Sequence, residues 1–424
     1  MPVLDLKAIR EDPEPYRKAL ARRGAADDLD QALQLDEERR KLTVRVEAIR
    51  AEQNRGSKLI REAGPEERQR LIESLRAVSD SLKGLEPGLV RVEQELGELA
   101  ARLPNVPDPS APDGLTDEDN EVVRVVGDLP ELGFEPKDHL ALGEALGIVD
   151  TDRGARTSGS RFAYLLGSAA RIQFALVQYG LDFAEARGFV PVVPPVLVRE
   201  EAMFGTGFLP TDEAQIYVTR EDNLYLVGTS EVSLASLHAG ELLEQGDLPR
   251  RYLGYSTCFR REAGTYGKDT RGIFRLHQFD KLEMFSFVLP ERSGEEHERL
   301  LAYEEEFVRS LGIPYRVVNV CTGELGASAA KKFDIEAWLP GQGRYREITS
   351  TSNTTDYQAR RLECRVRLPE GNRPVHTLNG TLTAIGRTLI ALLENGQRED
   401  GSVELPHALR PYLPEREWTL GLSG

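Results

Sequence analysis

Between Leu71 and Leu103, apolar residues recur along the chain at alternating steps of four and three. This spacing is typical of a helix that packs lengthwise against a partner helix. Residues 42–60 carry a stripe with the same rhythm, and Gly64-Pro65 separates the two runs, where it ends a helix and turns the chain. The sequence therefore predicts an antiparallel helical hairpin with arms about 45–55 Å long. The second stripe consists of Leu71, Leu75, Val78, Leu82, Leu85, Leu89, Val92, Leu96, Leu99 and Leu103.

The charge of this hairpin differs from that of the whole chain. The chain has a net charge of −16, but residues 31–102 contain 14 Lys or Arg and 14 Asp or Glu and are neutral. Residues 39–61 contain eight Lys or Arg against two Glu, a local net charge of +6. Such a face can contact phosphates or can simply be a solvated helix surface.

The remaining chain has a different composition. A stretch with four prolines and five acids follows the hairpin at residues 103–120 and is typical of an extended linker. We predict three parts: an N-terminal domain 1–103 with arms at about 31–63 and 66–103, a linker 104–120, and a larger domain 121–424. Strand-like and helical runs in the last part favour an α+β domain on an antiparallel sheet.

Several elements of the larger domain can be predicted from local pattern. Residues 171–187 form an amphipathic helix that Gly188 ends. The β-branched, proline-interrupted run 189–198 indicates an edge or interface strand. Two strands, 255–261 and 278–288, flank the polar loop 263–272, and a last helix is expected over 380–394.

Composition also excludes some classes of protein. No window approaches 18 uncharged apolar residues, and charges at Asp5, Lys7 and Arg10 interrupt the N-terminal run that a signal peptide needs. We therefore expect a cytoplasmic protein without a membrane partner. Three scattered cysteines and six unclustered histidines argue against a disulfide framework, and no zinc site is expected.

The sequence lacks the glycine-rich signatures of nucleotide-binding loops in a suitable context. Arginine is the usual alternative, because its planar guanidinium binds phosphate with two parallel hydrogen bonds and stays charged. Arg260, in CFRREAG, and Arg387, in NGTLTAIGRTLI, are the candidates. Either residue taken singly is more often a surface or salt-bridge residue, so the case depends on their surroundings.

Those surroundings resemble the three signature motifs of class II aminoacyl-tRNA synthetases. GFVPVVPPVLV is similar to motif 1, which builds the dimer interface, and CFRREAGTYGKDTRGIFRLHQFDKLEMF is similar to motif 2. NGTLTAIGRTLIALLEN is similar to motif 3. Within the class, the chain resembles the seryl-tRNA synthetases, through Gly228-Thr229-Ser230-Glu231, through EITSTSNTTDYQARR and through the hairpin. The fold implied is a helical hairpin, a coiled coil, followed by a class II antiparallel-sheet catalytic domain.

The resemblance implies a role for each residue of an ATP site. Arg260 would hold the α-phosphate, Glu262 the adenine amino group, and Phe279 and Leu276 the adenine ring. Arg387 would cover the other face of the nucleotide and reach the γ-phosphate. Glu347 and Ser350 would bind the phosphates through Mg²⁺. The implied ATP set also includes Arg261, Ile348 and Thr349, and the implied catalytic residues are Arg260 and Arg387.

The resemblance implies a serine site formed by Thr229, Ser230, Glu231, Glu283 and Thr381. Glu283 is the strongest of these from the residues themselves, because it is an acid between Leu282 and Met284 on a predicted buried strand. The implied reaction is attack of the serine carboxylate on the α-phosphorus of ATP, without a protein nucleophile. Transfer of serine to tRNA(Ser) would follow, with tRNA(Sec) as a further candidate acceptor. The resemblance also implies that the enzyme is a homodimer.

Some residues depart from the family pattern. Arg261 replaces a common serine, and threonines replace commoner residues at 349, 351, 354 and 355. One alternative is a specialised paralogue that loads a small amino acid onto a carrier protein or metabolite. Another is a non-catalytic tRNA-binding protein. The intact hairpin counts against the first, and the presence of Arg260, Glu262 and Arg387 counts against the second.

Overall fold

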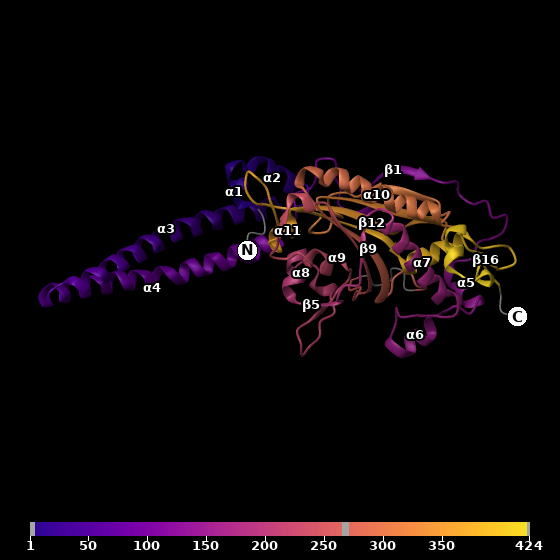
Figure 1. Cartoon of the computed structure of the whole chain (residues 1–424), viewed down its shortest axis with the longest axis horizontal. Helices are drawn as coiled ribbons and strands as arrows, with labels where there is room; N and C mark the ends of the chain where they lie inside the picture. Colours follow the sequence, from indigo (N-terminus) through magenta and orange to yellow (C-terminus); the bar gives the residue numbers. More distant parts are fainter. Residues whose placement is uncertain (1–4, 265–270, 422–424) are drawn as a thin grey trace. The chain divides into compact units, whose positions relative to one another are not determined.

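The chain divides into two units, Met1–Pro104 and Asn105–Gly424, in the computed structural model shown in Figure 1. The structure describes residues 5–264 and 271–421. Residues 265–270 of the predicted polar loop therefore lie outside the described residues. Each unit has its own apolar core, and we describe the two units separately.

The first unit is built on the predicted hairpin. Helix α3 spans Ala26–Glu62 and helix α4 spans Pro65–Arg102, so the first arm begins about a turn earlier than the heptad pattern indicated. Gly64 caps α4 in an extended conformation, and Pro65 occupies the first helical position, where its missing N–H costs nothing. The arms approach closely at Gly56, where a Cβ atom would lie 2.7 Å from Leu75 Cδ2.

Two short helices close the base of this hairpin. Helices α1 (Leu6–Glu11) and α2 (Pro13–Ala21) precede α3, and their apolar residues join those of both arms. Asp36 is buried there and accepts hydrogen bonds from Arg10 and Arg39. The buried cluster at the base consists of Ile9, Leu20, Ala25, Leu29, Ala32, Leu96, Leu99 and Leu103.

The second unit is organised on an eight-stranded sheet with the order β1-β10-β11-β12-β15-β9-β8-β4. Neighbouring strands are antiparallel except β4, which pairs in parallel with β8 at one edge. The sheet therefore confirms the predicted α+β class. The strands are β1 (Glu121–Val126), β10 (Tyr315–Asn319), β11 (Lys331–Leu339), β12 (Arg344–Thr355), β15 (His376–Ala384), β9 (Gln278–Val288), β8 (Arg250–Phe259) and β4 (Val190–Val192).

Helices cover one face of this sheet and leave most of the other face for a site. The long helices α7 (Ser168–Glu185), α10 (Ser293–Ser310) and α12 (Ile385–Asn395) pack on the first face. A Cβ atom on Gly180 of α7 would lie 2.3 Å from Leu282 Cδ1 of β9, so this helix sits close to the sheet. Shorter helices α8 (Glu200–Thr206), α9 (Glu231–Ser236) and α11 (Tyr357–Arg361) gather at one end of the sheet.

The prediction of a helix over 380–394 was wrong in its first part. Residues up to Ala384 belong to β15, and α12 begins at Ile385. β15 lies inside the sheet, with β12 on one side and β9 on the other. Hydrogen bonds to two neighbouring strands satisfy its backbone, and this tertiary pairing overrides the helical pattern that its small residues suggested.

The predicted edge strand over 189–198 forms only in part. Val190–Val192 pairs with β8, and Leu197–Val198 forms a separate strand, β5, which pairs with β6 (Tyr225–Leu226). Pro194 and Pro195 lie between them and cannot donate backbone hydrogen bonds. Motif 1 is therefore a strand at the sheet edge followed by a short irregular segment.

The proline-rich segment after the hairpin runs along the second unit. Asn105 N–H donates to Ala327 O at 2.8 Å, and its side-chain amide donates to Ser328 O and Thr354 O. Ala111 is buried with Val320, Leu325 and Ala329. Hydrogen bonds and burial thus tie this segment to the rest of the second unit. Among the described residues, none of the helices combines the length and the apolar character needed to cross a membrane.

Candidate active site

A cleft enclosing about 640 Å³ opens on the face of the sheet that the long helices leave free. The ends of β8, β9 and β12 and the first turn of α12 supply its walls. A second hollow of about 880 Å³ adjoins it toward α8 and α9. Arg260, Lys281, Ser350 and Thr381 line both spaces, so the two form one continuous site.

Arg260 follows directly after β8 and is fixed by its neighbours. Its Nε donates to Gly228 O at 3.2 Å, and its guanidinium carbon lies 5.4 Å from the centre of the Phe279 ring. A Cβ atom on Gly228 would lie 3.4 Å from Arg260 Cγ, so the Arg260 side chain packs in van der Waals contact with this segment. The remaining N–H groups of Arg260 are directed to a cleft where they can bind an anion.

Glu262 and Phe274 form another part of the wall of the cleft. Glu262 has a positive φ of 50°, which is uncommon outside glycine, and its Oε2 accepts from Arg275 Nη1 at 2.7 Å. The Phe274 ring faces two guanidinium groups, with Arg346 at 3.8 Å and Arg387 at 4.7 Å from its centre. A cation that lies over an aromatic face is attracted electrostatically by the ring. These contacts with Phe274 therefore orient both arginines.

Glu347 and Ser350 share one face of the sheet although they are three residues apart. Glu336 pairs with Glu347 and Asp334 pairs with Ser350, with a register shift between the two pairs. This bulge turns both side chains toward the cleft. Arg387 contacts Glu347 through its backbone oxygen at 3.0 Å and its carboxylate at 3.3 Å.

The charges around Glu347 hold it ionised. Burial raises the pKa of Glu347, but Arg387, Lys332 and Arg260 outweigh it and lower that pKa to about 2. The pKa of Asp334 is raised to about 7 by burial, against the attraction of Lys332, whose Nζ lies 2.9 Å from its Oδ1. Cations and one ionised carboxylate therefore face the cleft together, as a polyanion with a metal ion requires.

The adjoining hollow is polar and charged. Lys281 and Glu283 are two residues apart on β9 and so face the same side, with Nζ and Oε2 separated by 2.5 Å. Thr229 Oγ1 accepts from Lys281 Nζ at 2.7 Å, and Thr381 Oγ1 donates to Glu283 Oε2 at 2.9 Å. Lys281 and Glu283 are 6% and 1% exposed, so their charges act in a medium of low dielectric constant.

Glu231 completes this hollow at the start of α9. Its Oε1 accepts from Gln358 Nε2 at 2.8 Å. Burial and the Glu283 carboxylate raise the pKa of Glu231 to about 7, against the attraction of Lys281. Two carboxyl groups and one ammonium group thus surround a space that suits a small zwitterion with a polar side chain.

The structure brings most of the sequence-predicted site residues together. The cleft is lined by Arg260, Glu262, Leu276, Phe279, Glu347, Ile348, Thr349, Ser350, Thr381 and Arg387, and the adjoining hollow by Thr229, Glu231, Glu283 and Thr381. Two predicted residues do not line either space. Arg261 is exposed, and the hydroxyl of Ser230 is buried close to Gly254, where a Cβ atom would lie 2.9 Å away.

Other residues of the site did not come from the sequence. Lys281, Phe274, Arg275 and Asp212 line the two spaces, and Gln358 holds Glu231 from behind. For Lys281 a signal was present, because its spacing of two from Glu283 on a predicted strand places both on one face. Asp212 and Gln358 reach the site only through the arrangement of α8 and α11, which local pattern does not predict.

A further carboxyl group lies behind the site, on the helical face. Glu304 of α10 is fully buried; its Oε2 accepts from Thr349 Oγ1 at 2.9 Å, and its Oε1 has no hydrogen-bond partner among the described residues. A Cβ atom on Gly380 would lie 2.6 Å from that Oε1. Burial raises the pKa of Glu304 well above its ordinary value, which favours the neutral form of this carboxyl in the folded chain.

This raised pKa gives a pH-dependent stability. Between the ordinary glutamate pKa and the raised one, the unfolded chain binds fewer protons, so the free energy of unfolding falls as pH rises, by at most about 1.4 kcal/mol per pH unit. Glu304→Gln removes this loss. We expect the thermal midpoint of Glu304→Gln, relative to wild type, to increase steadily from pH 5 to pH 8 in differential scanning fluorimetry.

Glu298→Gln, at a largely exposed position of the same helix, controls for the loss of a carboxyl group from α10. A Glu304→Gln midpoint that follows the wild type in parallel over this pH range would contradict a protonated Glu304.

Comparison with known proteins gives a consistent result. Residues 216–396 match the family model for the tRNA synthetase class II core domain (G, H, P, S and T), and residues 3–107 match the seryl-tRNA synthetase N-terminal domain. The chain is 52% identical over 412 residues to the serine–tRNA ligase of Acidothermus cellulolyticus, covering 97% of this chain and 98% of the relative. It is 49% identical to that of Rubrobacter xylanophilus, with the same coverage.

Solved structures agree with these matches. The crystal structure of seryl-tRNA synthetase from Pyrococcus horikoshii, complexed with ATP, superposes with a TM-score of 0.91 at 40% identity, covering 99% of this chain and 100% of that one. The cytoplasmic serine–tRNA ligase from Naegleria fowleri, in complex with AMP, gives a TM-score of 0.87 at 34% identity and covers 99% of both chains.

Proposed function

The chain belongs to the seryl-tRNA synthetase family, and from this premise we propose that it activates L-serine with ATP and transfers the seryl group to the 3′ end of tRNA(Ser). The observation that carries the proposal is the continuous site, in which an arginine-lined cleft joins a polar, charged hollow through Lys281 and Thr381. One part suits a nucleotide and the other an amino acid. Their shared wall is where the two would react.

In the arginine-lined cleft, the chain binds and orients ATP. Arg260 holds the α-phosphate, and Phe279 and Leu276 contact the adenine, whose amino group Glu262 binds. Arg387 covers the nucleotide and reaches the γ-phosphate. A serine carboxylate oxygen bonds to the α-phosphorus as the bond to pyrophosphate breaks. Arg260 and Arg387 stabilise the negative charge that develops on the phosphates, because they are already fixed before the reaction.

In the adjoining hollow, the chain binds serine. Glu283 and Glu231 attract the ammonium group, and Thr229 and Thr381 surround the substrate with hydroxyl groups. Because a buried site built for hydrogen bonds leaves polar groups unpaired when the substrate lacks a hydroxyl, it rejects apolar analogues strongly. The Lys281 ammonium offsets the charge of one of the two carboxylates. The other carboxylate is then left to attract the ammonium group of one amino acid.

Mg²⁺ is part of the proposal through Glu347 and Ser350. The Glu347 side chain is 40% exposed in the cleft and is ionised, as its lowered pKa requires. Mg²⁺ is commonly held by one or two carboxylates together with substrate phosphates, and this pair of residues fits that mode. When bound, the ion supplies positive charge to the phosphate oxygens.

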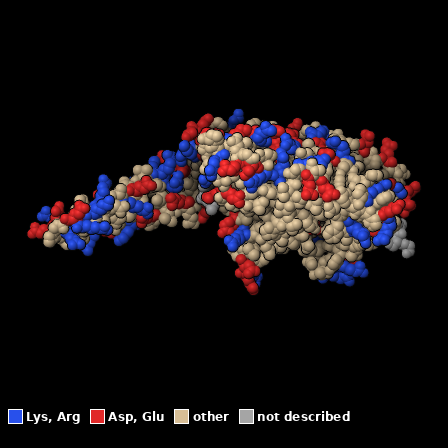
Figure 2. Space-filling view, viewed as in Figure 1, with Lys and Arg blue, Asp and Glu red and all other residues tan. Residues whose placement is uncertain are grey.

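The hairpin is the proposed tRNA contact. Arg45, Arg55, Lys58 and Arg61 of α3 are exposed and make no ion pair with another residue of the described chain, whereas Arg39 and Arg40 are paired with Asp36. In Figure 2 the hairpin carries Lys and Arg side chains along its length among acidic ones. Unpaired cations of this kind bind phosphates and release counterions.

We also propose a homodimer in the cytoplasm. Large apolar side chains of motif 1 and α7 are exposed, with Val193 at 83%, Phe174 at 64% and Val190 at 56%. A patch of this kind often marks a protein interface. The three cysteines are free, buried thiols, which suits a reducing compartment.

The function is tested by charging total bacterial tRNA with ATP and each of several labelled amino acids. We expect labelled serine alone to become bound to tRNA, and purified tRNA(Ser) and tRNA(Sec) to identify the acceptor. Serine-dependent pyrophosphate exchange without transfer to any tRNA would contradict the proposal and favour a carrier-loading paralogue. Absence of both activities would favour a non-catalytic tRNA-binding protein.

A further inference from the structure

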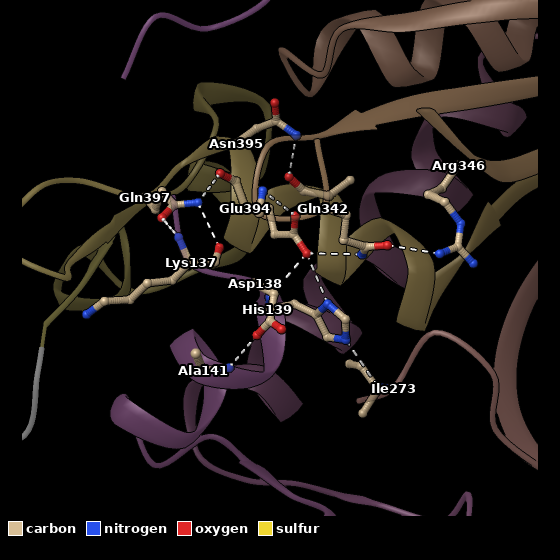
Figure 3. A network of polar contacts seen from close by, with 12 residues as sticks. Lys137, Asp138, His139, Ala141, Ile273, Gln342, Arg346, Glu394, Asn395 and Gln397 are labelled. Atoms are coloured by element: carbon tan, nitrogen blue, oxygen red, sulfur yellow. Dashed lines mark hydrogen bonds and ion pairs between the residues drawn. The ribbon is translucent and has the colours of Figure 1, made fainter. Parts of the chain in front are cut away.

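A histidine outside the three motifs contacts the wall of the ATP cleft from behind. His139 begins helix α5 (His139–Ala145) and is 6% exposed. Its Nδ1 lies 3.0 Å from Glu394 Oε1 of α12, and its Nε2 accepts from the backbone N–H of Ile273 at 3.3 Å. Figure 3 shows the ring between these two partners. Three segments distant in sequence therefore meet at one imidazole.

The partners determine the tautomer of this ring. Because the Ile273 N–H is a donor, the Nε2 atom must carry the lone pair, and the proton of the neutral imidazole is on Nδ1. Nδ1–H then donates to Glu394. The other neutral tautomer, with its proton on Nε2, would place that hydrogen against the Ile273 N–H and leave Glu394 without a donor from the ring.

Glu394 is held by several other donors. It is completely buried and accepts from the backbone N–H groups of His139 and Gly341 and from the side-chain amide of Gln342, at 3.1, 3.0 and 3.3 Å. Gln342 Oε1 in turn accepts from Arg346 Nη1 at 2.9 Å. The carboxylate is therefore fixed, and so is the histidine that it orients.

The Ile273 amide matters because the next residue is part of the nucleotide cleft. Ile273 and Phe274 both line it, and the Phe274 ring contacts Arg346 and Arg387. The chain reaches Ile273 through Gly272, which has a φ of +76° and approaches so closely that a Cβ atom would lie 2.1 Å from His139 Nε2. No other residue fits over the imidazole at that position without displacing it.

We propose that His139 is a positioning residue for ATP. As the Nδ1–H tautomer, it fixes the Ile273 amide and so sets Phe274 against Arg387, the arginine proposed to cover the nucleotide. None of these residues lines the serine hollow. Loss of the His139 contacts should therefore weaken the binding of ATP and not that of serine. This inference rests on the proposed function for the identity of the nucleotide.

Amide substitutions separate the two hydrogen bonds of the ring. Glutamine places an amide near the position of Nε2 and can still accept from Ile273, whereas asparagine places its amide near Nδ1 and can still donate to Glu394. We expect His139→Asn to raise the Kd and KM for ATP about tenfold, equivalent to about 1.4 kcal/mol. We expect His139→Gln to retain most of the ATP affinity, and the KM for serine to change by less than about twofold in both variants.

Equilibrium binding of ATP to the full chain and serine-dependent pyrophosphate exchange are the measurements, with thermal midpoints recorded for each variant. Gly272→Ala keeps both His139 and Glu394 in the sequence but should displace the His139 imidazole, and it should give the same selective loss of ATP affinity. Equal changes of ATP affinity in His139→Asn and His139→Gln would overturn the proposal. So would parallel changes in the KM values for ATP and serine. Because ATP binding is measured without serine, wild-type chain that binds ATP but shows no exchange would count against the proposed function and not against His139.

Discussion

Glu283→Gln is expected to reduce serine-dependent pyrophosphate exchange at least about a hundredfold in kcat/KM, while ATP binding changes little. The Glu283 carboxylate is 1% exposed and holds both Lys281 and Thr381. Replacing it with a neutral amide leaves the Lys281 ammonium buried without its partner and removes a charge that binds the substrate ammonium. Truncating one partner of a buried, hydrogen-bonded charge pair in a binding site costs about 2–5 kcal/mol of binding free energy, and about 2.7 kcal/mol corresponds to a factor of about a hundred.

The measurement is initial-rate exchange over a range of serine concentrations, together with equilibrium ATP binding. Glu336→Gln is a matched control, because Glu336 is a carboxylate of the same sheet that is paired with Arg316 and lines neither space of the site. It should change kcat/KM for serine by less than about threefold. A near-normal KM for serine in Glu283→Gln would remove Glu283 from the serine site.

The hairpin and the class of the larger domain could be predicted because their signals are local. A heptad stripe and a Gly-Pro turn are enough to specify two antiparallel helices, and the structure confirms them. The strands around motif 2 are also found close to their predicted places, with β9 at Gln278–Val288 and β8 ending at Phe259. Local pattern failed at residues 380–384, because pairing on both sides of β15 decides the conformation of its backbone.

Two buried ionisable residues, Glu304 and Lys281, show where a closer analysis of pattern would have helped. Glu304 lies four residues after Leu300 and four before Val308, so the helical period places it on the buried face of α10, although the acidic run around it suggests a solvated surface. Lys281 and Glu283 share a strand face by their spacing. Both signals were present in the sequence and depended on choosing the correct period.

His139 is different, because nothing near it in sequence indicates its role. Its partners are 134 and 255 residues away, and they meet only when α5, α12 and the middle of the motif 2 segment are assembled. The family resemblance indicates residues that line the cleft and the hollow, whereas the residues that hold them in place depend on tertiary packing. For that reason the lining residues could be predicted and the supporting network could not.

Shortening the hairpin is expected to separate the two steps of the reaction. Replacing residues 47–88 with a flexible glycine-serine bridge of about six residues keeps the base cluster of Ile9, Leu20, Leu29, Leu96 and Leu99 and removes Arg50, Arg55, Lys58 and Arg61. The site lies wholly in the other unit. We expect serine-dependent pyrophosphate exchange within about threefold of wild type and kcat/KM for tRNA(Ser) lower by at least about a hundredfold, because several phosphate contacts are lost together.

A subtler variant tests whether charge causes this loss. Changing Arg45, Arg55, Lys58 and Arg61 to glutamine keeps the helix, since glutamine is a good helix former, and removes four exposed cations. Each phosphate contact contributes about one unit to the slope of log affinity against log salt, so the variant should bind tRNA more weakly and with a shallower slope. Lys83→Gln with Arg91→Gln is the control, because these cations of the second arm lie beside Asp80 and Glu95. An unchanged salt slope in the fourfold variant, or full tRNA charging by the shortened chain, would show that tRNA is gripped elsewhere and that the α3 cations are a solvated face.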